Sequence, residues 1–157
     1  MRKRSKYKPK PVLVDPVAFV VESSTLLTDH GNYVLNWKLK NHAAFAALMK
    51  GLAQKSDLDT LVAARNVTEG IMVVLDGVDV DGTLARSAVA LIDVCERASA
   101  GKGTAMRATE MQAMRDLMQL HDELLDVVTV GQMEKAIAYA KKEIAAGRAN
   151  RLKEVAA

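Results

Sequence analysis

Apolar residues recur at helical spacing in five segments of this chain, and turn-forming residues separate each segment from the next. Side chains three and four positions apart share one face of a helix, so the pattern predicts amphipathic helices. The segments are residues 33–50, 56–75, 83–99, 110–127 and 130–146. A sixth, short helix is expected at Pro16, with Asp15 as its cap, because proline is tolerated in the first turn of a helix.

Start and stop signals set the expected helix boundaries. Three pairs have the spacing of a capping box, in which a hydroxyl residue precedes Gln or an acid by three positions. The pairs are Ser56 with Asp59, Thr109 with Gln112, and Thr129 with Gln132. Gly51 and Gly147 each follow a segment and are natural helix ends. The expected loops lie near residues 51–56, 76–82, 100–108 and 128.

The same spacing predicts which side chains face inward. On the segment 33–50 the stripe consists of Leu35, Leu39, His42, Ala46 and Met49. On the segment 83–99 it consists of Leu84, Val89, Ile92 and Cys95. The stripe on the segment 56–75 is interrupted at Gly70. Before the first of these helices, residues 29–32 (DHGN) are typical of a turn.

The chain is predicted to be all-α, a compact bundle of five or six helices with a basic, extended N-terminal arm. Aromatic residues make up only 4% of the chain, and β-structure depends on aromatic and β-branched residues, so helices are favoured. The expected organisation is an arm at residues 1–11, a helical domain at 12–147 and a basic C-terminal tail at 148–157. Pro9 and Pro11 deny the arm a helix and favour an extended form.

Charge is distributed unevenly along the chain. Residues 1–10 contain six Lys and Arg and no acid. Residues 11–140 contain 11 Lys and Arg but 17 Asp and Glu, and residues 141–157 contain five Lys and Arg and two Glu. A dense cationic block attracts phosphates, so nucleic acid, DNA or RNA, is the expected partner. Tyr7 adds a ring that can stack on a base. The candidate nucleic-acid-binding residues are Arg2, Lys3, Arg4, Lys6, Tyr7, Lys8 and Lys10.

The cysteine content and the hydropathy of the chain indicate the cellular compartment in which the protein is expected. The single cysteine, Cys95, excludes an internal disulfide framework and suits a reducing compartment. The apolar runs at residues 12–14 and 17–21 are short and are interrupted by Asp15 and Pro16, which makes a poor signal peptide. No stretch of about 18 uncharged apolar residues exists, so no membrane span or membrane partner is expected. We therefore expect a cytoplasmic protein.

One short motif has the form of a catalytic site. Residues 79–84 (DVDGTL) follow an apolar run and resemble the first motif of the haloacid dehalogenase phosphohydrolases. In that family the first Asp is the nucleophile and the second is the acid/base, beside a magnesium ion. The segments around this motif are predicted helices, without the alternating strands that such an enzyme needs. We interpret the motif as a helix–helix loop in which Asp81 caps the next helix, and keep a phosphohydrolase as a remote alternative.

No residues form a metal or cofactor site of recognisable spacing. If Gly82 took the sixth position of a calcium-binding loop, Gly77 and Ala88 would stand at its first and twelfth positions, where carboxylates are needed. The histidines lack the second ligand one helical turn away that a zinc site would require. These histidines are His30, His42 and His121. We therefore expect no cofactor, no metal and no enzymatic activity.

Three stretches of the sequence, RKRSKYKPKPV, LKNHAAFAALMKG and HDELLDVVTV, resemble a group of small helical proteins encoded in bacteriophage and prophage genomes. Some members of this group are labelled Fis-type transcriptional regulators. The resemblance extends along most of the chain and implies a phage origin and the cytoplasm of a bacterial host. A Fis-type protein would carry a basic recognition helix near its C-terminus, where residues 130–146 contain Lys135, Lys141 and Lys142.

These observations predict a phage-type accessory or regulatory protein that binds nucleic acid through its basic N-terminal arm. The alternative is a non-enzymatic protein-interaction module, such as a phage inhibitor of a host factor or a virion accessory component. Its acidic body and methionine-rich helices would then be the working surface, and a host or phage protein would be the partner. A homo-oligomer is compatible with both hypotheses.

Overall fold

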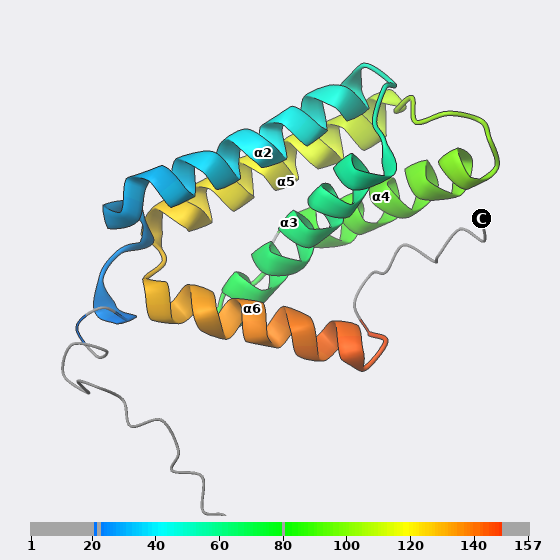
Figure 1. The fold of residues 1–157 in the computed structure, drawn as a ribbon. Coiled ribbons are helices and arrows are strands. Elements are labelled where there is room, and N and C mark those ends of the chain that lie inside the picture. The colour runs from blue at the N-terminus through cyan, green and yellow to red at the C-terminus, as the bar shows by residue number, and fades with distance from the viewer. Residues whose placement is uncertain (1–20, 22, 80, 149–157) are drawn as a thin grey trace, which may run out of the picture.

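Five α-helices and one 3-10 helix make up the described part of the chain (Figure 1). The structure is a computed structural model, and it describes residues 21, 23–79 and 81–148. The elements are η1 (Leu27–His30), α2 (Gly31–Met49), α3 (Lys55–Val74), α4 (Thr83–Ser99), α5 (Ala108–Val127) and α6 (Val130–Ala145). These residues form no strand, only an isolated bridge between Leu26 and Thr129. The all-α prediction is confirmed.

Several expectations for the two ends of the chain lie outside the described residues. They concern the extended basic arm at residues 1–11, the short helix at Pro16 and residues 149–157 of the basic tail. Within the described part, no helix combines the length and the apolar character that crossing a lipid bilayer would require.

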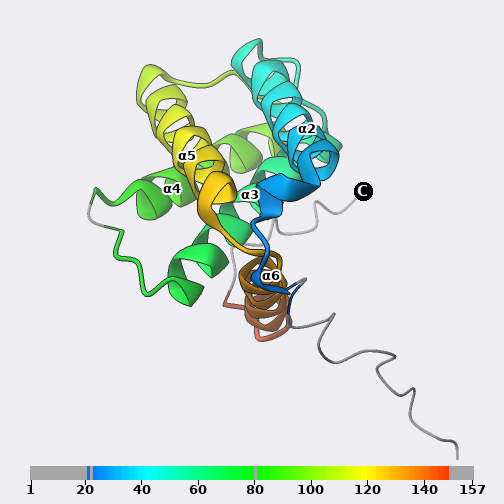
Figure 2. The ribbon, with the colours of Figure 1, turned by 90° about the vertical axis from the view of Figure 1, so that its left-hand side faces the viewer.

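The central helix of the bundle is α3, which packs against each of the other four α-helices. Two of these, α2 and α5, lie side by side and run antiparallel. Lys38 pairs with Asp126 and His42 pairs with Asp122, so the residue numbers rise along α2 as they fall along α5. α4 packs on α5 and α3, whereas α6 packs mainly on α3. Figure 2 shows α6 almost end-on, below the other four helices. α6 therefore forms one side of the bundle largely by itself.

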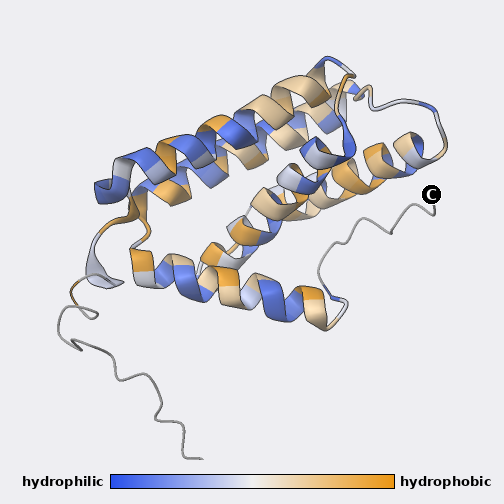
Figure 3. Ribbon diagram, viewed as in Figure 1, coloured by the Kyte–Doolittle hydropathy of each residue, from blue (hydrophilic) through white to orange (hydrophobic). Residues whose placement is uncertain are grey.

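The buried apolar side chains form two clusters. The larger cluster joins α2, α3, α4 and α5 and includes Phe45, Leu61, Val94 and Leu117. The smaller cluster attaches the first half of α6 to α2, α3 and α5, and its buried members are Val34, Ile71, Leu125, Val128, Met133 and Ala136. Hydrophobic and hydrophilic bands alternate along the helices in Figure 3, as expected for helices that bury one side.

The helix ends largely follow the predicted signals. The capping box at the start of α6 is confirmed, because Gln132 N donates to Thr129 Oγ1 (3.2 Å) and Thr129 N donates to Gln132 Oε1 (2.9 Å). Gly51 and Gly147, each two positions after the last residue of α2 or α6, have φ angles of +68° and +71°, as expected for helix-terminating glycines. The predicted turn at residues 29–32 is wrong, because η1 runs on into α2 there.

The predicted starts at Ser56 and Thr109 are wrong, because each helix begins earlier and uses a different cap. A carboxylate in the first turn accepts the N–H of the residue before the helix. These bonds run from Gln54 N to Asp57 Oδ2 (2.8 Å) and from Arg107 N to Glu110 Oε2 (2.7 Å). An ionised carboxylate accepts more strongly than a neutral group and is favoured by the helix dipole at this end, so it determines the start.

α2 turns a different face inward from the one predicted. Its buried residues are Val34, Asn41, Ala44, Phe45 and Leu48. Leu35, Leu39 and Met49, which were predicted to face inward, are 56%, 58% and 40% exposed. Because α2 is apolar on two faces, spacing alone does not determine its rotation. The observed rotation places Phe45 and Leu48 in the core and Asn41 against the buried His121.

α4 shows a smaller error of the same kind. Leu84 is buried as predicted and Cys95 is partly buried, but Val89 and Ile92 are 59% and 42% exposed. The buried face of α4 consists of Thr83, Leu84, Ser87, Ala90, Leu91 and Val94. Ser87 lies on this face because its hydroxyl is satisfied by the carbonyl of Leu84 (3.1 Å), so its burial leaves no unpaired polar group.

The interruption at Gly70 marks the closest approach between α3 and α6. A Cβ atom at this position would lie 2.5 Å from the carbonyl oxygen of Ala136. That distance is shorter than any carbon–oxygen contact that packing allows, so only glycine fits. The glycine therefore allows α6 to pack directly on the backbone of α3.

Candidate nucleic-acid interface

All seven candidate residues of the basic arm belong to the first 20 residues, outside the described part of the chain. They are Arg2, Lys3, Arg4, Lys6, Tyr7, Lys8 and Lys10. The structure does describe where the chain that follows them joins the bundle. That junction defines where the described chain enters the bundle.

Residues 23–27 are held against the turn between α5 and α6. The two backbone hydrogen bonds run from Leu27 N to Val128 O (2.9 Å) and from Val130 N to Thr25 O (3.0 Å). Gly131 permits this contact, because a Cβ atom there would lie 2.8 Å from the carbonyl oxygen of Ser23. The chain therefore enters the bundle beside the N-terminus of α6.

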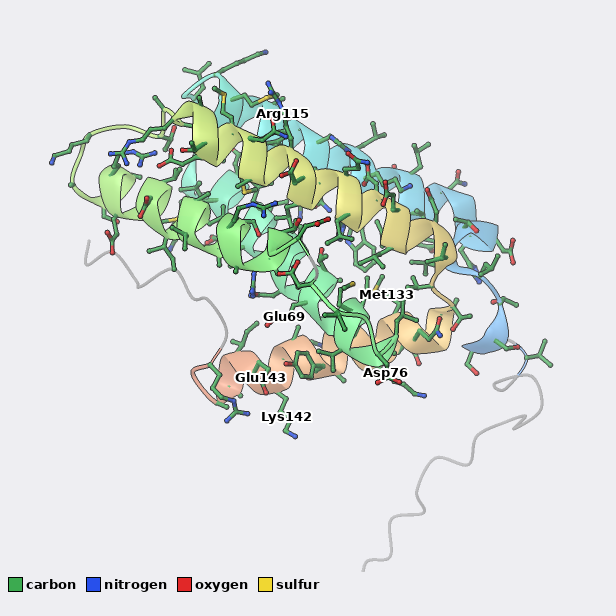
Figure 4. All side chains as sticks on the ribbon, turned by 180° about the vertical axis from the view of Figure 1, so that it is seen from behind. Glu69, Asp76, Arg115, Met133, Lys142 and Glu143 are labelled. Atoms are coloured by element: carbon green, nitrogen blue, oxygen red, sulfur yellow. The ribbon has the colours of Figure 1, made fainter. Side chains whose placement is uncertain are left out.

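α6 turns cationic side chains towards solvent. Its inward face is formed by Met133, Ala136 and Ala140, which pack on the rest of the bundle. Its outward face includes Lys135, Lys141 and Lys142, all exposed. Figure 4 shows the Lys142 side chain pointing away from the bundle. The burial of a small apolar face thus fixes the direction in which these three ammonium groups project.

The acids on this segment offset only part of its positive charge. Glu143 accepts two hydrogen bonds from Arg148, Nε to Oε2 and Nη2 to Oε1, each 2.8 Å long. These bonds lower the pKa of Glu143 and raise the pKa of Arg148, so both groups are ionised and neutralise each other. Glu134 is the other acid between residues 130 and 148. Its single negative charge compares with the three positive charges of Lys135, Lys141 and Lys142.

The acidic side chains of α5 are directed towards other helices. The pairs are Lys38 with Asp126 (2.6 Å), His42 with Asp122 (2.7 Å) and Arg86 with Asp116 (3.3 Å). The cations of these pairs belong to α2 and α4, so the acids face the part of the bundle away from α6. Side chains of α2 and α4 therefore engage these three carboxylates of α5, which do not pair with the lysines on the outward face of α6.

The DVDGTL motif forms the start of α4. Asp79 Oδ2 accepts the N–H of Leu84 (3.0 Å), and Gly82, with a φ angle of +65°, occupies the position before the helix. The prediction that Asp81 caps α4 is therefore wrong, since Asp79 supplies the carboxylate. Gly82 holds a left-handed backbone conformation at the N-cap position, and the carboxylate of Asp79, three residues earlier, bonds to the first turn. The carbonyl of Asp81 instead accepts a hydrogen bond from Arg86.

A cleft of about 700 Å³ lies between this loop and α5. Its charged lining consists of Asp79, Asp81, Arg86, Asp116 and Glu123. The two carboxylates of the motif stand on a helix–helix loop, not at the end of a strand as in the phosphohydrolases. Among the residues that the structure describes, no three His, Cys, Asp or Glu side chains are placed to hold a metal ion.

His121 is buried among α2, α3 and α5, where it joins Asn41 and Thr68. The Thr68 hydroxyl donates its only proton to Ala64 O (2.8 Å), so it accepts the Nδ1–H of His121 (2.8 Å). The Nε2 atom then accepts from Asn41 Nδ2 (3.0 Å). Burial lowers the pKa of His121 to about 4, which keeps the ring neutral. This network links three helices and serves the architecture.

A second buried polar contact holds the loop between α4 and α5 against the ends of both helices. Arg97 donates two hydrogen bonds of 2.7 Å to the buried carboxylate of Glu110 and a third, of 3.0 Å, to Ala105 O. Burial acts to raise the pKa of Glu110, but the bonds from Arg97 and from Arg107 N outweigh it and lower the pKa. The pKa of Arg97 is raised by the same contact. Both groups are therefore charged, and the pair fixes the loop.

Comparison with known proteins found no match to this chain among family models, curated proteins or solved structures. The residues themselves therefore carry the argument for function. The sequence showed the lysines of α6 but not that residues 23–27 meet the N-terminal end of that helix. This contact is made by a pair of backbone hydrogen bonds. Any residue except proline can donate such a bond, so the side-chain pattern of the sequence does not reveal it.

Proposed function

We propose that this protein binds nucleic acid through its basic N-terminal arm together with the outward face of α6, as a phage-type accessory or regulatory protein. The observation that carries the proposal is the junction of residues 23–27 with the α5–α6 turn. It brings the chain that follows the arm, whose first ten residues carry six cations, to the N-terminal end of the helix that carries Lys135, Lys141 and Lys142. This supports contact of one nucleic acid with two basic segments that are far apart in the sequence.

The dimensions of α6 suit contacts to a phosphate backbone. Lys135 and Lys142 are seven residues apart and so about 10 Å apart along the helix axis. Phosphates on one strand of a duplex follow one another at about 3.4 Å of helix rise, so this separation covers roughly three base pairs. Phosphate contacts of this kind give affinity that depends strongly on salt and little on base sequence.

The proposal is tested by fluorescence anisotropy with labelled duplex and single-stranded oligonucleotides at roughly 50 and 200 mM salt. The full chain should bind unrelated sequences with similar affinity and lose most of that affinity at the higher salt. Deleting residues 1–10 takes the formal net charge from +3 to −3 and should weaken binding at low salt by at least about 100-fold. The same deletion should leave the helical circular dichroism spectrum unchanged.

A matched pair of triple variants tests the part assigned to α6. Lys135→Gln, Lys141→Gln and Lys142→Gln together should weaken binding and reduce its salt dependence by about three ions. The control changes Lys50, Lys55 and Lys102 to Gln, which removes the same charge from exposed positions in or beside the α2–α3 and α4–α5 loops. Equal effects of the two triples would mean that only net charge matters. If the full chain does not bind at low salt, the proposal fails and the protein-interaction alternative takes its place.

A further inference from the structure

Two aromatic side chains lie exposed on the first half of α2. Aromatic residues make up only 4% of the chain, yet Tyr33 is 78% exposed and Trp37 is 38% exposed. Neither the Tyr33 hydroxyl nor the Trp37 indole N–H is hydrogen-bonded to any residue that the structure describes. Both rings are therefore available to a ligand from solution.

The two rings share one face of α2 with a lysine. Tyr33 and Trp37 are four residues apart, and Lys40 follows Trp37 by three residues, so the three side chains succeed one another along the helix. At about 100° of rotation per residue they fall within an arc of about 60°, over about 10 Å of helix length. Leu35 lies about 160° round the helix from Tyr33 on the same count. We call Tyr33, Trp37 and Lys40 the aromatic face of α2.

The charge on the aromatic face is positive. Lys40 is exposed and forms no ion pair with the described residues, and α2 itself contains no Asp or Glu. The acids of α5 approach α2 through Lys38 and His42, which lie at least about 100° round the helix from each residue of the aromatic face. Between residues 23 and 56 the chain contains four lysines and one acid, Asp29 of η1. The aromatic face therefore suits a ligand that combines flat rings with negative charge.

The aromatic face lies at the end of the bundle where the described chain enters. α2 continues directly from η1, and the residues before η1 bond to the α5–α6 turn. Val34, next to Tyr33, packs in the same apolar cluster as Met133 of α6. Figure 1 shows the starts of α2 and α6 at one end of the bundle. The aromatic face and the first turns of α6 are therefore close to each other.

We propose that the aromatic face of α2 binds single-stranded nucleic acid, with bases stacked on Tyr33 and Trp37 and the ammonium group of Lys40 on a phosphate. Aromatic rings beside cations are the groups by which proteins hold single strands without base preference. In a duplex the faces of each base are covered by its neighbours, whereas the bases of a single strand can be splayed apart and stacked on side chains. This inference rests on the proposed function and narrows it, because it names the preferred form of nucleic acid.

Trp37 is the only tryptophan of the chain, so its fluorescence reports directly on the aromatic face. The full chain is titrated at low salt with a labelled oligothymidylate of about 12 nucleotides. Anisotropy of the label follows binding, and tryptophan emission is recorded in parallel with unlabelled oligonucleotide. A base stacked on the indole should quench the emission, over the same range of concentration in which the anisotropy rises. A duplex of equal length should quench much less.

The two signals separate this inference from the proposed function. Binding by anisotropy without quenching of Trp37 would overturn the aromatic face and leave the proposed function standing. Absence of binding at low salt would overturn both. Deleting residues 1–10 should weaken binding but leave the quenching at saturation unchanged, because the deletion removes Tyr7 and the charge of the arm but not the rings of α2.

A pair of lysine variants tests the phosphate contact. Lys40→Gln should weaken binding of the oligothymidylate and reduce its salt dependence by about one ion. Lys50→Gln is the control, because it removes the same charge from the far end of α2, about 80° round the helix from Lys40. Equal changes in salt dependence for the two variants would overturn the phosphate contact at Lys40.

Substitutions at Tyr33 separate stacking from apolar contact, and its exposure means that none should alter the helical spectrum. Tyr33→Phe keeps the ring and should bind the oligothymidylate within about twofold of the wild type. Tyr33→Leu keeps an apolar side chain without a ring and should bind at least about fivefold more weakly, the loss of one stacked base. Leu35→Ala, on another side of α2, should match the wild type. Equal affinity of Tyr33→Leu and the wild type would overturn the proposal, as would equal losses in Tyr33→Leu and Leu35→Ala.

Discussion

A neutral His121 is required by both of its hydrogen bonds, since Thr68 must accept from the ring and Asn41 must donate to it. Burial lowers the pKa of His121 to about 4, whereas the unfolded chain retains the ordinary value of 6.5. Below pH 6.5 the unfolded chain therefore binds a proton that the folded chain does not. The contribution of His121 to stability is complete above pH 6.5 and is lost as the pH falls towards 4.

We predict that the free energy of unfolding decreases by about 3 kcal/mol between pH 7 and pH 4 through His121. Guanidinium unfolding followed by circular dichroism at a series of pH values measures it. His121→Gln removes this titration and should show a flatter profile in the same window. His30→Gln, at an exposed position, should keep the wild-type profile. Parallel profiles for the wild type and His121→Gln would assign the pH dependence to other groups.

The two acids of the DVDGTL motif differ in their structural task. Asp79 accepts the N–H of Leu84 at the start of α4, whereas the contact at Asp81 uses its backbone carbonyl. We predict that Asp79→Ala lowers the free energy of unfolding by about 1 kcal/mol, as expected for a lost cap. Asp81→Ala should change it by less than about 0.5 kcal/mol. Urea denaturation compares the two, and a larger loss at Asp81 would contradict the assignment.

At the scale of helices, the contact between α3 and α6 depends on the missing side chain of Gly70. Alanine is the better helix former by about 1 kcal/mol, so in an open position Gly→Ala stabilises a helix. At Gly70 the added Cβ would lie 2.5 Å from the backbone of Ala136. The backbone of α6 must then move, which separates the apolar residues that attach it to α3.

We therefore predict that Gly70→Ala lowers the free energy of unfolding by at least about 2 kcal/mol, despite the gain in helix propensity. Gly31→Ala is the control, because Gly31 is in helical geometry and a Cβ there meets no atom within 4 Å. That variant should be unchanged or slightly more stable. Thermal unfolding of the two variants measures the difference, and a stable Gly70→Ala variant would show that the helices tolerate a wider separation.

The helices themselves could be predicted from the sequence, because each combines helical spacing with breaks at Gly or cap residues. Their rotations could be predicted only in part. For α2, Leu35 and Leu39 on one face and Val34 and Leu48 on the other are equally apolar. The face that is buried packs against other helices, and its partners include residues as far as 80 positions away, such as His121, which bonds to Asn41. Spacing within one helix carries no information about such partners.

At the scale of the whole molecule, the candidate interface could also be predicted from the sequence only in part. The charge of residues 1–10 and the lysines of α6 are both readable from the sequence. The point at which the chain that follows residues 1–10 joins the bundle depends on residues 23–27 meeting the α5–α6 turn through backbone groups. Since backbone hydrogen bonds leave no pattern of side chains, the spatial relation required the structure.

Stability should also be unevenly distributed over the molecule. α3 contacts four helices and buries eight residues, whereas α6 packs mainly on α3 and buries three. Segments with few buried contacts open with a lower free energy than the whole domain. We therefore predict that the amides of α6 exchange with solvent deuterium faster than those of α3. The difference should be largest after Ala140, beyond the last buried residue of α6.

Hydrogen exchange followed by mass spectrometry of peptides measures this order of protection. Gly70→Ala should speed exchange in α6 more than in α4, because it disturbs only the contact between α3 and α6. Equal protection of α6 and α3 in the wild-type chain would mean that the helices open together, in a single cooperative unit. The predicted order instead describes a four-helix body, with α6 held against it by Gly70, by the small apolar cluster and by the junction with residues 23–27.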